Sequence, residues 1–177
     1  MMKKGIEKTV EIPEGIDLAI EGLRVSVEGP NGELSRNFDS RGIEIKKEDD
    51  KVIVKSESNR KRYKALVGTI ASHIRNMVQG VTEDFTSELK IVYSHFPLSV
   101  NVEGDSVKIE NFIGGEKPRY AKIVGNAEVQ INGDEIEVKG PNKEEVGQTA
   151  ANIEQIAQVK NKDPRVFQDG IYITKRP

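Results

Sequence analysis

The chain has 177 residues, of which 36% are hydrophobic and 32% charged, with a formal net charge of −2 and no cysteine. The lack of cysteine excludes disulfide frameworks, thiolate catalysis and Cys-type zinc sites. No apolar run approaches the ~18–20 residues of a membrane-spanning helix. The lysine pair near the start has no apolar core behind it, which is unlike a secretory signal. We therefore expect a soluble intracellular protein with no membrane partner.

Residues 6–54 have the pattern of short strands separated by turns. Apolar residues alternate loosely over 6–27, with a break at Pro13-Glu14-Gly15, and the pattern resumes at 34–38, 43–45 and 52–54. Gly29-Pro30-Asn31-Gly32 predicts a turn, because proline fixes one φ and Asn-Gly tolerates positive φ.

The apolar spacing becomes helical after residue 60. The residues on one predicted helical face are Tyr63, Leu66, Val67, Ile70, Ile74, Met77 and Val78. This pattern predicts a helix that ends at Gly80. The basic run 60–64 lies at its start, where the positive end of the helix disfavours cations. An RNA contact, neutralisation by Glu57 and a solvated charged face all stay open as explanations.

The second half repeats this order of elements. Strands are predicted at 89–93, 98–102, 107–109, 121–124, 127–131 and 136–138, before a helix capped at Gly140-Pro141-Asn142. Val67-Gly68 aligns with Val146-Gly147 in the two helices. We therefore predict an α+β fold of two tandem similar units, 1–81 and 82–177, each an antiparallel sheet covered by one helix. One continuous α+β domain is the alternative.

The two helical glycines each cost about 1 kcal/mol relative to alanine. Close packing of helix on sheet and approach of an RNA backbone both explain Gly147, whereas packing is favoured for Gly68.

No catalytic constellation is present in the sequence. Ser94 and His95 are neighbours in an extended segment, so their side chains point to opposite faces and cannot act as a nucleophile–base pair. His73 flanks the apolar face of the first helix. There is no HExxH, phosphate-binding GxxxxGK[ST] or GxGxxG motif. We expect no enzyme, no metal, no cofactor and no small-molecule substrate.

A cationic segment ends the chain. Residues 155–176 hold five Lys/Arg and two Asp/Glu, a net charge of +3, whereas residues 82–159 carry −7. This contrast favours a polyanion partner. Lys160, Lys162 and Arg165 are expected to project from a loop, because Pro164 prevents the helix from continuing.

Other residues of this segment have two interpretations. Phe167 is either a stacking platform for a base or an anchor for a small core. Tyr172 lies on the open face of a strand if Ile171 and Ile173 are core residues. Lys175 and Arg176 either extend the cationic site or form a solubilising tail.

The same segment resembles the C-terminal signature of the large-subunit ribosomal protein "L six" family, in its archaeal and eukaryotic branch (eukaryotic "L nine"). The residues that carry the resemblance are Gln155, Val159, Lys162, Arg165, Phe167, Asp169-Gly170-Ile171-Tyr172-Ile173 and Arg176. Supporting motifs are Tyr93-Ser94-His95-Phe96-Pro97, Asn111–Lys117, Val146-Gly147-Gln148 and, more loosely, Gly29–Leu34.

The resemblance implies a two-domain rRNA-binding protein near the base of the sarcin–ricin stem, monomeric within the ribosome and next to other ribosomal proteins. It adds Lys117, Arg119, Gly147, Gln148 and His95 to the candidate RNA contacts. The alternative function is a protein-interaction module that uses acidic sheet faces and exposed strand edges.

Overall fold

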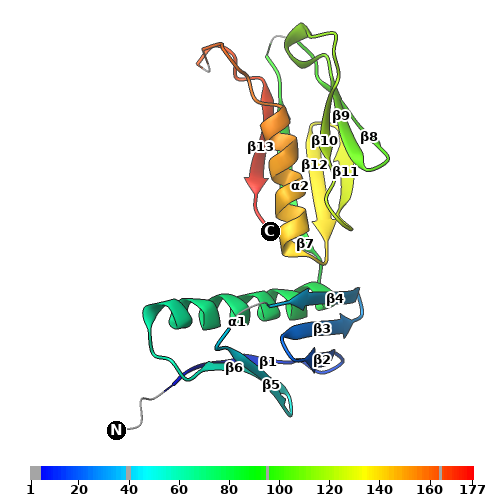
Figure 1. Cartoon of the computed structure of the whole chain (residues 1–177). Coiled ribbons are helices and arrows are strands. Elements are labelled where there is room, and N and C mark those ends of the chain that lie inside the picture. Colours follow the sequence, from blue (N-terminus) through cyan, green and yellow to red (C-terminus); the bar gives the residue numbers. More distant parts are fainter. Residues whose placement is uncertain (1–4, 39–40, 95, 164) are drawn as a thin grey trace. The chain divides into compact units, whose positions relative to one another are not determined.

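The computed structural model describes residues 5–38, 41–94, 96–163 and 165–177. The chain divides into two compact units, Met1–Asp84 and Phe85–Pro177 (Figure 1). Each unit holds one long helix and antiparallel strands. The α+β class and the two tandem similar units predicted from the sequence are confirmed. Neither helix of the described ranges has the length and apolar character needed to cross a membrane.

The first unit distributes its strands between two antiparallel sheets rather than one. The strands are β1 (Ile6–Glu11), β2 (Asp17–Glu21), β3 (Arg24–Gly29), β4 (Gly32–Asn37), β5 (Glu44–Glu48) and β6 (Lys51–Ser56). They pair in the orders β1-β6-β5 and β2-β3-β4. The helix α1 (Lys61–Thr82) packs on both sheets through β1, β3 and β6, so one core serves the whole unit.

Gly80 does not end α1, contrary to the sequence prediction. The helix continues to Thr82, and Gly80 is buried within it. Tertiary contacts hold the last turn: Val81 is fully buried, and its carbonyl accepts a hydrogen bond from the Asn31 N–H at 2.9 Å. A Cβ at Gly29 would lie 2.8 Å from the Val81 side chain, so this turn needs a glycine for close approach.

The second unit repeats the plan. Its strands are β7 (Phe85–Val92), β8 (Ser99–Glu103), β9 (Ser106–Glu110), β10 (Arg119–Lys122), β11 (Glu128–Asn132), β12 (Glu135–Gly140) and β13 (Gly170–Lys175), with the short 3₁₀ turn η1 (Phe112–Gly114). They pair in the orders β10-β9-β8 and β11-β12-β7-β13.

The helix α2 (Lys143–Ile156) packs on strands of both sheets of this unit, β10 of one sheet and β7, β12 and β13 of the other. Its start is capped as predicted, because the Asn142 side chain accepts a hydrogen bond from the Glu144 N–H at 3.0 Å. Val146, Ala150 and Ile153 are almost completely buried, as their spacing predicts. The chain then leaves α2 and returns as β13, an edge strand of the four-stranded sheet.

Close packing does not explain the two helical glycines. A Cβ at Gly68 would meet only the Lys8 Nζ, at 3.6 Å, and one at Gly147 only the Pro177 Cγ, at 3.7 Å. Both are ordinary van der Waals distances, so the preference for packing at Gly68 was wrong.

Candidate nucleic-acid interface

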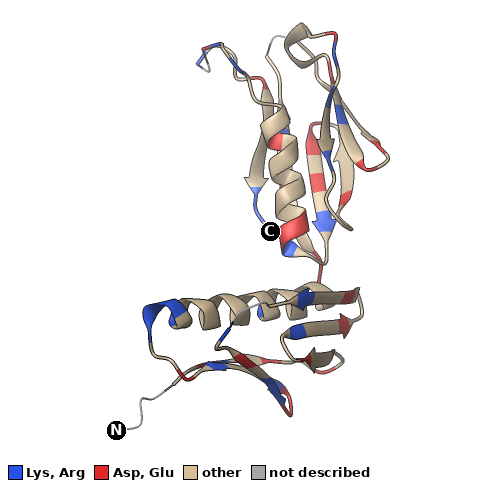
Figure 2. Cartoon of the chain, in the orientation of Figure 1, with Lys and Arg blue, Asp and Glu red and all other residues tan. Residues whose placement is uncertain are grey.

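The C-terminal loop, residues 157–169, connects α2 to β13 at one end of the second unit. Lys160, Lys162 and Arg165 are exposed along it. The blue of Lys and Arg on this loop is visible in Figure 2. Within the ranges that the structure describes, none of the three forms an ion pair with a carboxylate. Their positive charge is therefore available to an external anion.

The carboxylate of Asp163, between Lys162 and Arg165 in the sequence, is used by the backbone of the loop. The Asp163 Oδ1 accepts a hydrogen bond from the Arg165 N–H at 2.9 Å. The Asp163 carbonyl accepts from the Val166 and Phe167 N–H groups at 3.1 and 3.0 Å. These bonds define a turn after Asp163, and Arg165 is exposed on it.

Phe167 is half-buried and does not join the described residues that pack against the core of the second unit. The Lys162 Nζ lies 4.3 Å from the centre of its ring. The two side chains form one patch in which a cation covers an aromatic face. The stacking and core-anchor interpretations of Phe167 are both compatible with this contact.

The loop is fixed to the unit at its far end. Asp169 is only 1% exposed, and its Oδ1 accepts a hydrogen bond from the Ser94 N–H at 2.8 Å. Ile171, two residues further on, is buried in the core.

Lys175 and Arg176 do not join the cations of the C-terminal loop. They lie at the other end of β13, and a strand of six residues separates its ends by roughly 20 Å. Gly147, near the start of α2, lies close to this second group, because it approaches Pro177. The sequence segment thus presents two basic groups at opposite ends of the unit (Figure 2).

Lys175 has an internal partner. Its Nζ lies 2.8 Å from the Glu88 Oε1, and this hydrogen bond raises the pKa of the lysine above its usual value. Tyr172 is 46% exposed on the open face, as the alternation with Ile171 predicts, and its hydroxyl donates to the Gln168 carbonyl at 3.1 Å.

Arg119 supports the end of α2. Its guanidinium donates to the carbonyl of Ile156 at 2.7 Å and to that of Gln158 at 3.4 Å. It also lies 4.2 Å from the ring centre of Phe112. These contacts cap the helix C-terminus, where a cation is favourable. Lys117, two residues earlier, is exposed. His95 lies outside the described residues.

A groove of about 570 Å³ runs between α2 and β10 toward the C-terminal loop. Its lining residues are Tyr120, Ala121, Lys122, Asn152, Gln155, Ile156, Gln158 and Lys160. Gln148 lies beside it, because its Nε2 donates to the Asn152 Oδ1 at 2.9 Å. We call this surface the α2–β10 groove.

Comparisons with known proteins agree with this two-unit architecture. The family model described as Ribosomal protein L6 matches residues 12–84 and 96–170. A large ribosomal subunit protein uL6 of Methanosarcina mazei is 50% identical over 175 residues, which cover 99% of this chain and 99% of the relative. The protein of the same name from Archaeoglobus fulgidus is 53% identical, over 97% of this chain and 90% of the relative.

This chain belongs to the ribosomal protein L6 family. The resemblance found in the C-terminal signature, including its archaeal character, is confirmed. Membership makes the chain a structural component of the ribosome rather than an enzyme, and a ribosomal protein of this kind is cytoplasmic.

Part of the α2–β10 groove was not predicted from the sequence of this L6-family chain. Tyr120 and Lys122 alternate on β10 with the buried Ala121, and a period of two could have found them. Asn152 and Gln155 follow Gln148, already a candidate RNA contact, at the i, i+4, i+7 spacing of one helical stripe. Asn152 was not predicted as part of this stripe, because the helix was assigned from the spacing of its apolar residues.

Proposed function

We propose that this chain binds rRNA of the large ribosomal subunit through the C-terminal loop of its second unit. The observation that carries the proposal is the set of three exposed cations, Lys160, Lys162 and Arg165, none paired with a carboxylate in the described part of the chain. They project from a unit that is otherwise strongly negative, at −7 over residues 82–159. A local cationic loop on an acidic body binds a polyanion at one place rather than over its whole surface.

The loop is suited to this role because both of its ends are held. Arg119 caps the preceding helix, and the buried Asp169 ties the following residues to Ser94. A loop whose ends are fixed before binding loses less conformational entropy when it binds. Arg165 can donate two parallel hydrogen bonds to a phosphate, and the lysines act as point charges.

Family resemblance supports a finer location, near the sarcin–ricin stem in the factor-binding region. In this proposal the chain is a monomer within the ribosome, and its remaining surfaces face neighbouring ribosomal proteins. The protein clamps rRNA and performs no chemical step.

The alternative function, a protein-interaction module that uses an acidic sheet face, has less support. On the open face of the four-stranded sheet, Lys139 pairs with Glu137 at 3.1 Å and Lys175 pairs with Glu88 at 2.8 Å. These ion pairs reduce the net field that an acidic face would offer to a basic partner. If this function were the main one, the partners captured from a lysate would survive nuclease treatment.

The test replaces Lys160, Lys162 and Arg165 together with alanine. Affinity for a large-subunit rRNA fragment is measured by fluorescence anisotropy over a range of salt concentrations. Each phosphate contact contributes about 0.7–0.9 to the slope of log affinity against log salt. We expect the triple variant to bind more weakly and to lose roughly two to three from the magnitude of this slope.

The control removes three exposed cations from the first unit, Arg41, Lys51 and Arg75, and so changes the net charge equally. It should retain most of the affinity. Circular dichroism establishes that both variants are folded. Equal affinities for the folded triple variant and the parent protein would refute the proposal.

A further inference from the structure

The α2–β10 groove has no carboxylate in its lining, which sets it apart from other grooves of this acidic protein. Its polar lining consists of two lysines, three amides and one tyrosine. Its volume of about 570 Å³ lies within the ~300–1,000 Å³ typical of small-ligand sites. The groove is therefore large enough and electrostatically suited for an anionic organic group.

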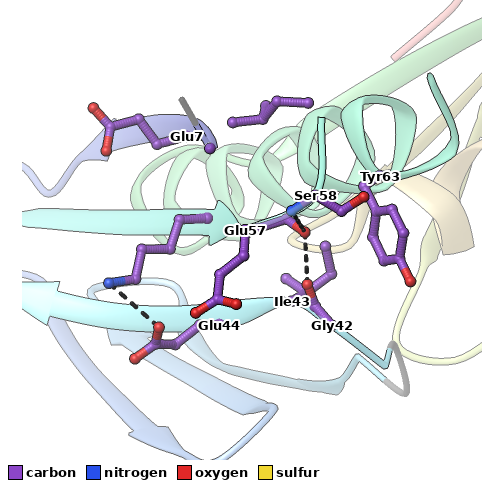
Figure 3. A pocket seen from close by; sticks show the side chains of 11 residues that line it. Glu7, Gly42, Ile43, Glu44, Glu57, Ser58 and Tyr63 are labelled. Atoms are coloured by element: carbon purple, nitrogen blue, oxygen red, sulfur yellow. Dashed lines mark hydrogen bonds and ion pairs between the residues drawn. The ribbon is translucent and has the colours of Figure 1, made fainter. Parts of the chain in front are cut away.

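Two other grooves have the opposite character. A groove of about 1280 Å³ in the first unit is lined by Glu7, Glu44 and Glu57, beside Tyr63 (Figure 3). There, hydrogen bonds from Lys46 and Lys55 lower the pKa of Glu44, so the site keeps its negative charge. A further groove is lined by Glu88, Glu135 and Glu137. Each of these two linings holds three glutamates and one lysine, so its net negative charge disfavours a phosphate.

Tyr120 gives the α2–β10 groove an aromatic wall. The residue is 49% exposed, whereas its neighbour Ala121 is fully buried and holds β10 against the core. β10 is paired along its length with β9, with Tyr120 opposite Lys108. An exposed ring on a rigid strand is a stacking platform for a base.

The opposite wall offers amide groups. The Asn152 Nδ2 donates to the Lys122 carbonyl at 2.9 Å, which joins the two walls. The side chains of Gln155 and Gln158 are exposed and form no hydrogen bond within the described ranges. An amide both donates and accepts hydrogen bonds, and can therefore pair with the edge of a nucleobase.

Lys160 connects this groove to the C-terminal loop, because it belongs to both. A strand of RNA whose phosphates contact the loop can thus extend into the groove without crossing a carboxylate of its lining. Lys122 lies at the groove as a second cation.

We propose that the α2–β10 groove holds an unpaired nucleotide of the bound RNA. In this arrangement the base stacks on Tyr120, Gln155 and Gln158 hydrogen-bond its edge, and Lys122 and Lys160 contact the flanking phosphates. The inference rests on the proposed rRNA-binding function and adds to it a preference for single-stranded nucleotides.

The experiment compares two RNA probes of equal phosphate count, a single-stranded oligoadenylate and a blunt duplex, on the full-length chain. Stacking on an aromatic residue contributes ~1–3 kcal/mol per base, or roughly 5- to 150-fold in affinity. We expect Tyr120→Ala to weaken oligoadenylate binding by a factor in this range and to leave duplex binding unchanged. Tyr120→Phe should behave like the parent protein, because it keeps the ring.

Lys122→Ala is a second variant that does not alter the ring, and it should weaken oligoadenylate binding more than duplex binding. Equal binding of oligoadenylate by the parent protein and Tyr120→Ala would overturn the inference, and so would equal loss in Tyr120→Ala and Tyr120→Phe. In either case, weaker duplex binding by the Lys160, Lys162 and Arg165 triple variant would leave the proposed function standing. Failure of both probes to bind the parent protein would overturn both proposals.

Discussion

Gly147 lies inside a helix, where a glycine lowers stability, and the fold itself does not explain why a glycine is present. A glycine inside a helix is less favourable than alanine by about 1 kcal/mol. A Cβ at this position would meet only Pro177, at ordinary contact distance. Gly68 is its counterpart in the first unit, with similar space around it. The two positions therefore form a matched pair for testing whether RNA approaches α2 closely.

Both Gly68→Ala and Gly147→Ala should raise the free energy of unfolding, each by up to about 1 kcal/mol, because alanine restricts the unfolded chain and favours the helix. Only Gly147→Ala should weaken rRNA binding, since its methyl group would separate the RNA backbone from the helix. A loss of about 1 kcal/mol corresponds to a roughly fivefold higher Kd. Urea denaturation and RNA titration of both variants measure the two effects.

Unchanged RNA affinity in a stabilised Gly147→Ala variant would remove Gly147 from the interface. Reduced affinity in Gly68→Ala as well would show that the effect is not specific to α2.

At the residue scale, the exposure of the loop cations could be predicted from the sequence, but the contacts that hold the loop in place could not. Lys160, Lys162 and Arg165 could be predicted to be exposed, because they are closely spaced polar residues around a proline. The capping role of Arg119 could not be predicted, since it depends on the Ile156 carbonyl, 37 residues away. The Arg119 guanidinium donates hydrogen bonds to the carbonyls at the end of α2.

The two helices begin in contrasting ways, although they occupy equivalent places in the two units. The first turn of α2 holds Glu144 and Glu145 after the capping residue Asn142. The first turn of α1 has no acidic residue, and Arg60 at the N-cap of α1 makes no side-chain capping hydrogen bond. Cations at a helix N-terminus are unfavourable by ~0.3–1 kcal/mol each. No ion pair joins Glu57 to the run 60–64 in the described ranges, which argues against neutralisation by that residue.

Replacing Arg60 with Asp should therefore stabilise the first unit by about 1 kcal/mol, because Asp caps the helix and complements its dipole. Asn142→Ala should destabilise the second unit by a similar amount, ~0.5–2 kcal/mol, because it removes an existing cap. Thermal and urea denaturation of the two variants test the signs. A destabilised Arg60→Asp variant would contradict this account of the α1 start. If the variant is more stable yet binds rRNA less tightly, the basic run has been retained for RNA.

At the element scale, periodicity was sufficient to predict strands and helices but not their grouping. Alternation over 6–54 predicted the strands, yet nothing in a period of two says which strands share a sheet. Each helix packs on strands of both sheets of its unit, so the division into two sheets depends on contacts between residues that are distant in sequence. Likewise, the continuation of α1 past Gly80 depends on Val81 and Asn31, which are distant in sequence.

For the molecule as a whole, the duplication was visible because both halves repeat the same order of strands and helix. Each unit also has its own core: one is built from residues between Val10 and Val81, the other from residues between Phe85 and Ile171. The C-terminal loop and the α2–β10 groove both belong to the second unit. The parts proposed to bind RNA are therefore independent of the first core.

It follows that residues 85–177 produced alone should fold and carry most of the RNA affinity. We expect a single cooperative unfolding transition, because the second core takes no residue from the first unit. We also expect a salt slope close to that of the full chain, because the loop cations are all present. Residues 1–84 alone serve as the control and should bind the same rRNA fragment much more weakly. A folded second unit with a distinctly smaller salt slope would show that the first unit supplies phosphate contacts. The basic run 60–64, exposed at the start of α1, would then be the first place to look for them.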